Sequence, residues 1–413
     1  MVTKGAVRPS QPACIIKKAG GRSQAGCWRA VLSIALMAVL FAPSVLGDTI
    51  SMPVMQYGSG STSSNLVYSP DGTQFLAGYS DGVIRLWDIE TLSFVKSFSG
   101  HSSSVTNVAY SADGSKIISC GGESSARVWS VASGLQVRTL SGHPGSVADA
   151  CFSPDGTVAV TGSGGYLPGT TTKYGEARLY EVATGRLIRT LSGHAGIVLS
   201  VTCSPDGTKV LTGSQDRTAM LWDLATGTLL RTFTGHTAYV NVAAFSPDGS
   251  RILTGSSDDT GKLWDLATGA VVRTFDNGHA VSSAAFSPDG SGVLFGLQCS
   301  DRSVSPSYWG EARLWDVVSG TQTRTFSGHA SYVNSVSFSP DGTRVVVGAG
   351  GQNAILYETA TGNVIKTLDV ASGCGGPVAV SSDGSRILAG STLLDTATGA
   401  QLGTFSWWPG SLL

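Results

Sequence analysis

Short apolar runs alternate with turn-forming residues along most of the chain. Residues 239–275 show the pattern: the apolar stretches VNVAAFS, RILTGS, GKLWDL and AVVRTF are separated by clusters that include Pro-Asp-Gly and Ala-Thr-Gly. Proline presets φ and glycine accepts positive φ, so these clusters predict tight turns. Short strands joined by short links pair antiparallel. The stretch therefore predicts a meander of four antiparallel strands.

The same unit recurs with a period near 42 residues. The motif Ser-x-Asp-Gly occurs eight times, with its aspartates at Asp71, Asp113, Asp155, Asp206, Asp248, Asp289, Asp341 and Asp383. Successive spacings are 42, 42, 51, 42, 41, 52 and 42 residues, so two units carry about ten residues more than the others. One meander cannot bury both of its faces, so the repeat predicts a radial stack of sheets, a β-propeller.

Two dipeptides stand at fixed places in the units. Gly-His opens most units, and Trp-Asp ends the third predicted strand at Trp87-Asp88, Trp222-Asp223, Trp264-Asp265 and Trp315-Asp316. Degenerate versions stand at Trp129-Ser130, Tyr180-Glu181 and Tyr357-Glu358. With the eight Ser-x-Asp-Gly motifs, residues 50–406 resemble the WD-repeat family. The resemblance implies an all-β propeller of four-stranded antiparallel blades.

Eight units favour eight blades in one propeller domain, residues 48–413. The repeats lie near 58–99, 100–141, 142–192, 193–234, 235–276, 277–327, 328–369 and 370–406. The eighth is the weakest, because its third strand shortens to STLLD. Residues 50–56 align with fourth-strand positions, and we expect them to pair beside the last blade and close the ring. The alternative is seven blades, with part of the terminal sequence forming a cap.

Every histidine follows a glycine: His101, His143, His194, His236, His279 and His329. The family resemblance implies a structural network that joins this imidazole to a second-strand hydroxyl, a turn aspartate and the third-strand tryptophan. Such a set suits its chemistry, since a buried indole N–H needs an acceptor and a carboxylate can accept the imidazole proton. Two units have every member: His194, Thr212, Asp216 and Trp222, and His236, Thr254, Asp258 and Trp264.

The other units depart from this set. The second has Glu123 where aspartate is expected, the third has Tyr180 for tryptophan, the sixth and seventh lack the turn aspartate, and the first has no histidine. We expect blades with incomplete networks to be less stable. Because the imidazoles are spread around a ring, each within its own blade, we predict no catalytic residues, no metal site and no cofactor.

Both longer units differ from the rest in the link between the second and third strands, at residues 163–181 and 298–316. We expect the insertions to project as loops from one rim, three blades apart, and their apolar residues to be candidates for partner binding: Tyr166, Leu167, Tyr174, Tyr308 and Trp309. The alternative is that each insertion folds over its own blade and buries Trp309 or Tyr174. The repeated pairs Glu176–Arg178 and Glu311–Arg313 predict cross-strand salt bridges or a solvated face. Trp407 and Trp408 are expected to cap the last blade or to dock a partner.

The N-terminal segment has the order of a secretory signal. A basic stretch precedes the apolar run AVLSIALMAVLFAPSVLG, and Val45 and Gly47 are small residues at the positions before a cleavage site. We expect residues 1–47 to be a signal peptide and the protein to be secreted or periplasmic. The alternative is an uncleaved membrane anchor facing outside the cytoplasm.

The amino-acid composition limits the classes of partner that we expect the protein to bind. The 54 glycines favour tight turns, and a net charge of −1 with 13% charged residues provides no basic surface for nucleic acid. Five cysteines would follow Gly47, an odd number, so at least one stays unpaired in a monomer. Cys151 and Cys203 lie in apolar runs and are expected to fill the core.

These features predict a monomeric, non-catalytic scaffold that binds partner proteins through loops on one rim. The alternatives are an exported propeller enzyme, hydrolase-like, or a ligand-binding protein with its site at the mouth of the central channel. A third is a structural envelope component held at the membrane by the apolar run. Fold resemblance alone does not identify a partner.

Overall fold

The computed structural model describes residues 66–79, 81–88, 94–166, 169–300, 308–349, 353–369, 378–381, 383–389 and 392–404. The chain divides into two units, Met1–Thr49 and Ile50–Leu413, and every described residue belongs to the second. The expected signal segment, the expected closing strand at 50–56 and the terminal pair Trp407 and Trp408 lie outside the described residues.

The described residues form 32 strands and no helix, and the strands group in chain order into eight antiparallel sheets of four. Blades 1 to 4 comprise β1 (Leu66–Tyr68), β2 (Gln74–Gly78), β3 (Val83–Asp88) and β4 (Phe94–Ser99); β5 (Val105–Tyr110), β6 (Lys116–Gly121), β7 (Ala126–Ser130) and β8 (Gln136–Leu140); β9 (Val147–Phe152), β10 (Val158–Tyr166), β11 (Lys173–Glu181) and β12 (Leu187–His194); and β13 (Val198–Cys203), β14 (Lys209–Ser214), β15 (Ala219–Asp223) and β16 (Leu229–Phe233). Blades 5 to 8 comprise β17 (Val240–Phe245), β18 (Arg251–Ser256), β19 (Thr260–Asp265) and β20 (Val271–Asp276); β21 (Ala280–Phe286), β22 (Gly292–Ser300), β23 (Tyr308–Asp316) and β24 (Gln322–His329); β25 (Val333–Phe338), β26 (Arg344–Ala349), β27 (Asn353–Glu358) and β28 (Val364–Asp369); and β29 (Val378–Val380), β30 (Arg386–Ala389), β31 (Thr392–Asp395) and β32 (Gln401–Thr404).

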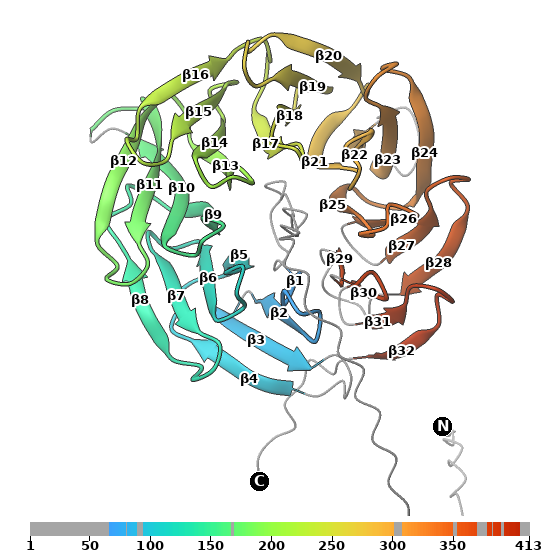
Figure 1. Ribbon diagram of the computed structural model, residues 1–413, viewed down its shortest axis with the longest axis horizontal. Coiled ribbons are helices and arrows are strands. Elements are labelled where there is room, and N and C mark those ends of the chain that lie inside the picture. Colours follow the sequence, from blue (N-terminus) through green and yellow to red (C-terminus); the bar gives the residue numbers. More distant parts are fainter. Residues whose placement is uncertain are drawn as a thin grey trace, which may run out of the picture. The chain divides into compact units, whose positions relative to one another are not determined.

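Within this unit the sheets form a closed ring. The first strand of each blade contacts the first strand of the next, and β29 of blade 8 contacts β1 of blade 1 (Figure 1). First strands lie at the centre and fourth strands at the outside. The prediction of an eight-bladed, all-β propeller is confirmed.

Burial explains why the apolar runs of the sequence differ from strand to strand. The second strand of blade 4, β14, buries every residue after Lys209, whereas the outer strand β16 buries only Phe233. Core clusters join neighbouring sheets: Leu76 and Ile84 of blade 1 pack with Val108 and Trp129 of blade 2. The radial stack therefore buries both faces of the inner strands, as a single meander cannot.

Each Ser-x-Asp-Gly motif forms the turn between the first and second strands. Asp206 accepts hydrogen bonds from Ser204 Oγ and from Thr208 N at 3.0 Å, and Gly207 takes φ +69°. Burial alone would raise the pKa of Asp206, but the hydrogen bonds from Ser204 and Thr208 outweigh it and lower the pKa to about 2. The aspartate is thus an ionised turn residue at neutral pH.

Polar side chains also join one blade to the next. At the centre, Asp149 of blade 3 accepts hydrogen bonds from Asn107 Nδ2 of blade 2 at 2.7 Å and from Val201 N of blade 4 at 2.8 Å. At the outside, a basic residue of the fourth strand donates to a carbonyl in the turn after the third strand of the following blade. These pairs are Lys96 with Val131, Arg138 with Ala183, Arg189 with Ala225, Arg231 with Thr268, Arg273 with Val318, and Arg324 with Ala360.

Candidate functional site

Blade 4 brings its four predicted network residues together. His194 Nδ1 lies 2.7 Å from Asp216 Oδ2, His194 Nε2 lies 2.7 Å from Thr212 Oγ1, and Trp222 Nε1 donates to Thr212 Oγ1 at 3.0 Å. Asp216 also accepts from Ala195 N at 2.9 Å, so one carboxylate fixes both the imidazole and the backbone beside it. Since a carboxylate only accepts, its position assigns the imidazole proton to Nδ1.

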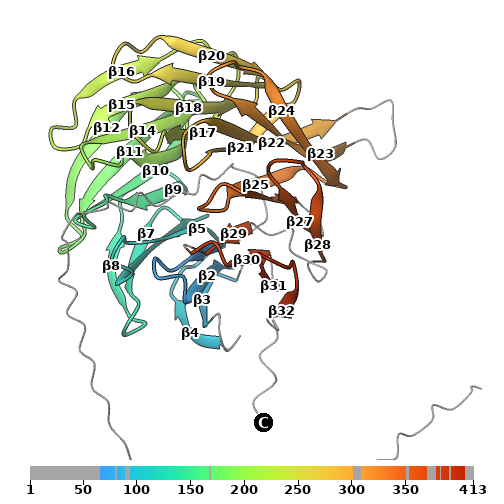
Figure 2. The same ribbon diagram turned by 45° about the vertical axis from the view of Figure 1, so that its right-hand side comes forward.

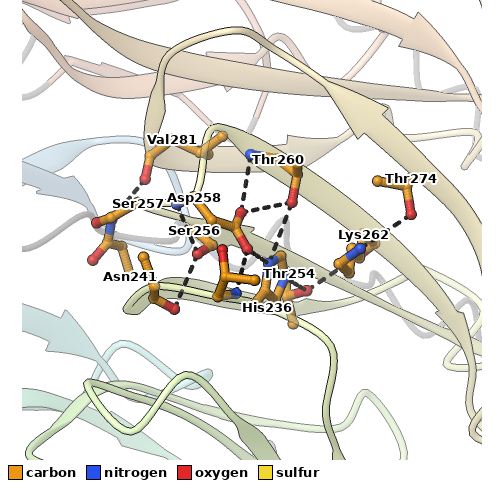
Figure 3. A network of polar contacts seen from close by, with 12 residues as sticks. His236, Asn241, Thr254, Ser256, Ser257, Asp258, Thr260, Lys262, Thr274 and Val281 are labelled. Carbon is orange, nitrogen blue, oxygen red and sulfur yellow. Dashed lines mark hydrogen bonds and ion pairs between the residues drawn. The ribbon is translucent and has the colours of Figure 1, made fainter.

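Blade 5 repeats this geometry, and Figure 3 shows its histidine, threonine and aspartate: His236, Thr254 and Asp258. His236 lies 2.8 Å from both Asp258 Oδ2 and Thr254 Oγ1, and Trp264 Nε1 donates to Thr254 at 2.9 Å. Burial lowers the pKa of His236, which favours the neutral imidazole. For Asp258, burial alone would raise the pKa, but hydrogen bonds from Thr260, Thr237 N and His236 outweigh it and lower the pKa. The pair is therefore a neutral histidine held by an ionised aspartate.

Blade 2 makes the same contacts with different residues. His101 lies 2.7 Å from Glu123 Oε1 and 2.7 Å from Ser119 Oγ, which also accepts from Trp129 Nε1 at 2.8 Å. Glu123 also binds Ser102 N and Arg127 Nε, each at 2.9 Å. Glu123 thus occupies the role expected of aspartate, and the contacts of this blade are complete although its sequence departs from the pattern.

Tyrosine replaces the tryptophan in blades 3 and 7, and its hydroxyl lies 3.3 Å from His143 Nε2 in blade 3 and 3.2 Å from His329 Nε2 in blade 7. In blade 3 Tyr180 Oη donates to the carbonyl of Ser141 at 2.9 Å, and His143 uses Thr161 Oγ1 at 2.8 Å and the carbonyl of Ser124 at 3.1 Å. Burial lowers the pKa of His143 to about 4, and no carboxylate contact counters it. In blade 7 Tyr357 Oη donates to the carbonyl of Ser327 at 2.7 Å.

Blade 6 contains a polar residue that the sequence reading did not single out. Trp315 Nε1 donates to Asn277 Oδ1 at 3.0 Å, and Arg313 Nη1 donates to the Asn277 carbonyl at 2.6 Å. Asn277 is buried and precedes Gly278-His279. The signal was present in the spacing: three residues lie between Phe275 and His279 here, whereas two lie between Phe233 and His236 in the preceding blade.

The networks leave the imidazoles in separate blades. Each described histidine of blades 2 to 5 is buried against residues of its own blade or of the one before it. Over the described residues, no group of three or more His, Cys, Asp and Glu side chains is placed to hold a metal ion. In the same part of the chain, no helix has the length and apolar character needed to cross a membrane. These histidines do not form a joint constellation for acid–base chemistry.

Over their described residues, both insertions lengthen the second and third strands of their blades. Strands β10, β11, β22 and β23 have nine residues each, against four to six in the second and third strands of other blades. Pairing continues out to Tyr166 opposite Lys173 and Ser300 opposite Tyr308. Figure 2 shows the β22–β23 hairpin projecting from one side of the ring. The β-ladder therefore takes up part of each insertion, and residues 167–168 and 301–307, between the paired strands, lie outside the described residues.

A glycine seats each long hairpin against the next blade. A Cβ atom on Gly175 would lie 2.0 Å from the carbonyl oxygen of Gly196, and one on Gly310 would lie 2.2 Å from that of Ser331. Only glycine permits this approach. The recurring aromatic-Gly-Glu sequence thus fixes the base of both hairpins, and Gly175 also pairs with His194 at the start of the next unit.

The candidate binding residues differ in exposure. Tyr166 is 57% exposed, and Lys173 Nζ lies 5.8 Å from the centre of its ring and 3.2 Å from Gln215 Oε1 of blade 4. Tyr174 is half-buried. Trp309 packs against a core cluster shared by blades 5 and 6 and contacts the His279 ring with centroids 5.5 Å apart. Leu167 and the Tyr308 side chain lie outside the described residues.

The repeated acid–base pairs lie along one strand. Arg178 bonds Glu176, and Arg313 Nε bonds Glu311 Oε1 at 2.7 Å, each pair two residues apart on β11 or β23. The expected cross-strand arrangement is therefore wrong, since residues i and i+2 point to the same face of one strand.

Comparison with known proteins identifies the repeat. The family described as WD domain, G-beta repeat matches residues 55–88, 92–130, 134–167, 185–223, 227–265 and 320–358, more than half of the chain. Similar proteins include an uncharacterized WD repeat-containing protein, sll1491, from Synechocystis sp., 39% identical over 17% of this chain and 21% of its own length. Two further similar proteins are named guanine nucleotide-binding protein subunit beta. The one from Solanum tuberosum is 40% identical over 17% of this chain and 19% of its own length. The one from Arabidopsis thaliana is 37% identical over 21% of this chain and 24% of its own length. The chain thus spans a quarter or less of these relatives, whereas the family match extends over six repeats, and the chain belongs to the WD40 repeat family.

Proposed function

We propose that this chain is an exported, non-catalytic scaffold that binds a partner protein through the rim formed by the β10–β11 and β22–β23 hairpins. Family membership supports the general role. Two of the relatives are named as subunits of a guanine nucleotide-binding protein, which by name are parts of larger assemblies. Export rests on the basic and apolar order of residues 1–47.

One observation carries the proposed rim: two blades, three apart in the ring, extend the same hairpin beyond the length used by the rest. Gly175 and Gly310 seat the described strands of these hairpins on the following blades, which supports binding with a small loss of conformational entropy in these strands. Tyr166 offers an exposed aromatic of the kind enriched at binding hot spots, with the Lys173 ammonium beside it. A partner with an apolar surface and a nearby acidic group fits this pair.

The test is affinity capture from the envelope fraction of the source. Three proteins serve as baits: the intact chain, a variant in which both hairpins are shortened to the length of β14, β15 and their link in blade 4, and the point variant Tyr166→Ser. A matched control is Val318→Ser, because Val318 is 74% exposed and follows the far end of β23. We expect capture to be lost on shortening, weakened at least about tenfold by Tyr166→Ser and unchanged by Val318→Ser.

Retention of the same partners by the shortened variant would contradict the rim. Turnover of small esters or lactones by the pure protein would favour the enzyme alternative. N-terminal sequencing of the mature protein tests export separately: Asp48 as the first residue is the expected result, and an intact Met1 in the membrane fraction would support the anchor.

A further inference from the structure

Two thiols from neighbouring blades meet near the centre of the ring. Cys151 lies on β9 of blade 3 and Cys203 on β13 of blade 4, and their Sγ atoms are 3.9 Å apart. Cys203 is 6% exposed, and Cys151 is half-buried against the same apolar cluster. Both side chains therefore lie between the two sheets rather than on the surface.

The repeat itself shows that these two positions change together. Cys203 stands just before the serine of its Ser-x-Asp-Gly turn. In the other units from the first to the seventh, the same position holds an aromatic residue: Tyr68, Tyr110, Phe152, Phe245, Phe286 and Phe338. The place of Cys151, one residue earlier, holds a smaller or aliphatic residue elsewhere: Val67, Ala109, Thr202, Ala244, Ala285, Ser337 and Ala379. Cysteine thus replaces a large ring at the one interface where the facing position is also cysteine.

A buried hydrogen bond fixes how the two strands face each other. Asp149 Oδ2 accepts from Val201 N at 2.8 Å, and each of these residues stands two positions before a cysteine. Because strand side chains alternate with a period of two, the same register places Cys151 opposite Cys203. Bonding requires the sulfur atoms to close from 3.9 Å to about 2.05 Å, a distance that side-chain rotation and small strand shifts can cover.

We propose that Cys151 and Cys203 form an inter-blade disulfide when the protein meets a disulfide oxidant, either a small-molecule disulfide or an oxidised thiol-disulfide oxidoreductase. The Cys151 thiolate attacks the oxidant and displaces one thiolate, giving a mixed disulfide. The Cys203 thiolate then attacks the Cys151 sulfur and displaces the second. The oxidant is reduced by two electrons to two thiols, which take up the two protons released by the cysteines.

The surroundings make this reaction slow but its product durable. The hydrogen bond with Cys203 and burial both raise the pKa of the Cys151 thiol, so little thiolate is present at neutral pH. The rate should therefore rise with pH. Once formed, the bond closes a loop that contains β10, β11 and β12, and a cross-link of this span restricts the unfolded chain. The inference does not depend on the proposed binding partner.

Peptide mapping of the full chain tests the pairing directly. The protein is incubated with oxidised glutathione, alkylated, and cleaved after lysine and arginine without reduction. Cys151 then lies on peptide 139–173 and Cys203 on peptide 190–209, each as its only cysteine. We expect these two peptides joined as the main cross-linked product, together with a rise of at least about 3 °C in the thermal midpoint relative to the reduced protein.

Three variants provide controls. The midpoint rise should vanish in Cys151→Ala and in Cys203→Ala and persist in Cys120→Ala, because Cys120 lies on β6 of blade 2. The proposal is overturned if both thiols remain alkylated in the wild-type protein after oxidation. It is equally overturned if either peptide joins mainly to another cysteine, and neither result requires a variant to fold.

Discussion

Blades 5 and 6 are neighbours in the ring, and each ends its third strand in Trp-Asp, but they satisfy the tryptophan in different ways. In blade 5, Trp264 and His236 share Thr254, and Asp258 holds the imidazole. In blade 6, Asn277 accepts from Trp315 Nε1, and His279 contacts Trp309, which pairs near the outer end of the long hairpin. With one additional residue before Gly-His in blade 6, Asn277 takes the position of tryptophan acceptor, and His279 contacts the long hairpin instead.

Blades that keep the repeat pattern use its polar side chains for hydrogen bonds within the blade. Blades 2, 4 and 5 bury the imidazole and the hydroxyl and bind the imidazole to a half-buried carboxylate, so these groups use their polar atoms within the blade. Blades 3 and 6 depart from the repeat pattern, and in each the hairpin of the second and third strands is longer. This hairpin carries Tyr166 in blade 3 and Trp309 in blade 6. Four predictions test this contrast.

The largest effect is expected from removing the carboxylate of a complete network. Asp258→Ala leaves His236 Nδ1 and Thr237 N without their acceptor, and we expect a loss of about 2–4 kcal/mol in the free energy of unfolding, measured by chemical denaturation. The matched control is Asp248→Ala in the exposed turn of the same blade, where we expect about 1 kcal/mol or less. Equal losses of unfolding free energy in the two variants would show that the network carboxylate stabilises the blade no more than a turn aspartate does.

A smaller effect is expected from Asn277. Asn277→Ala removes the acceptor of Trp315 Nε1 in a buried site, and we expect a loss of about 2 kcal/mol in the free energy of unfolding. Trp315→Phe removes the donor instead. If the hydrogen bond exists, the double variant should be more stable than the sum of the two single losses by about 1 kcal/mol. Strict additivity would mean that Asn277 does not replace the histidine network.

Acid should affect blade 3 through His143. Its pKa is lowered to about 4 in the folded protein, so the unfolded chain binds the proton more readily below pH 6.5. Stability is therefore present at neutral pH and is lost as the pH falls from about 6.5 towards 4, by about 1 kcal/mol at pH 5.5. The measurement is the free energy of unfolding at pH 7 and 5.5. His143→Gln should reduce the difference by that amount, and an unchanged difference would assign the acid sensitivity elsewhere.

Much of this architecture could be predicted from the sequence. The 42-residue period, the alternating apolar runs and the Pro-Asp-Gly turns suffice for eight four-stranded blades, because each is a local signal repeated in register. The members of the networks in blades 4 and 5 follow from the family resemblance.

Features that depend on contacts between distant residues were missed. Glu123 replaces aspartate because its longer side chain still reaches His101, which a pattern of residue types does not reveal. Asn277 differs from its repeat by one inserted residue. Strand pairing continues through residues with turn-like composition, such as Gly164 and Gly165, and Gly175 opposite Gly164 packs closely on the next blade. Asp149 acts between blades, and no single unit contains its partners.

Blades 5 and 7 offer the most direct test that a complete network stabilises its blade, because β18 and β26 have equal lengths and corresponding positions. Thr254 of β18 accepts from Trp264, whereas Val347 of β26 has no hydroxyl at the same place. The measurement is amide hydrogen exchange of both strands at pH 7. We expect the amides of β18 to exchange at least about tenfold more slowly than those of β26. Equal or slower exchange in β26 would contradict the account.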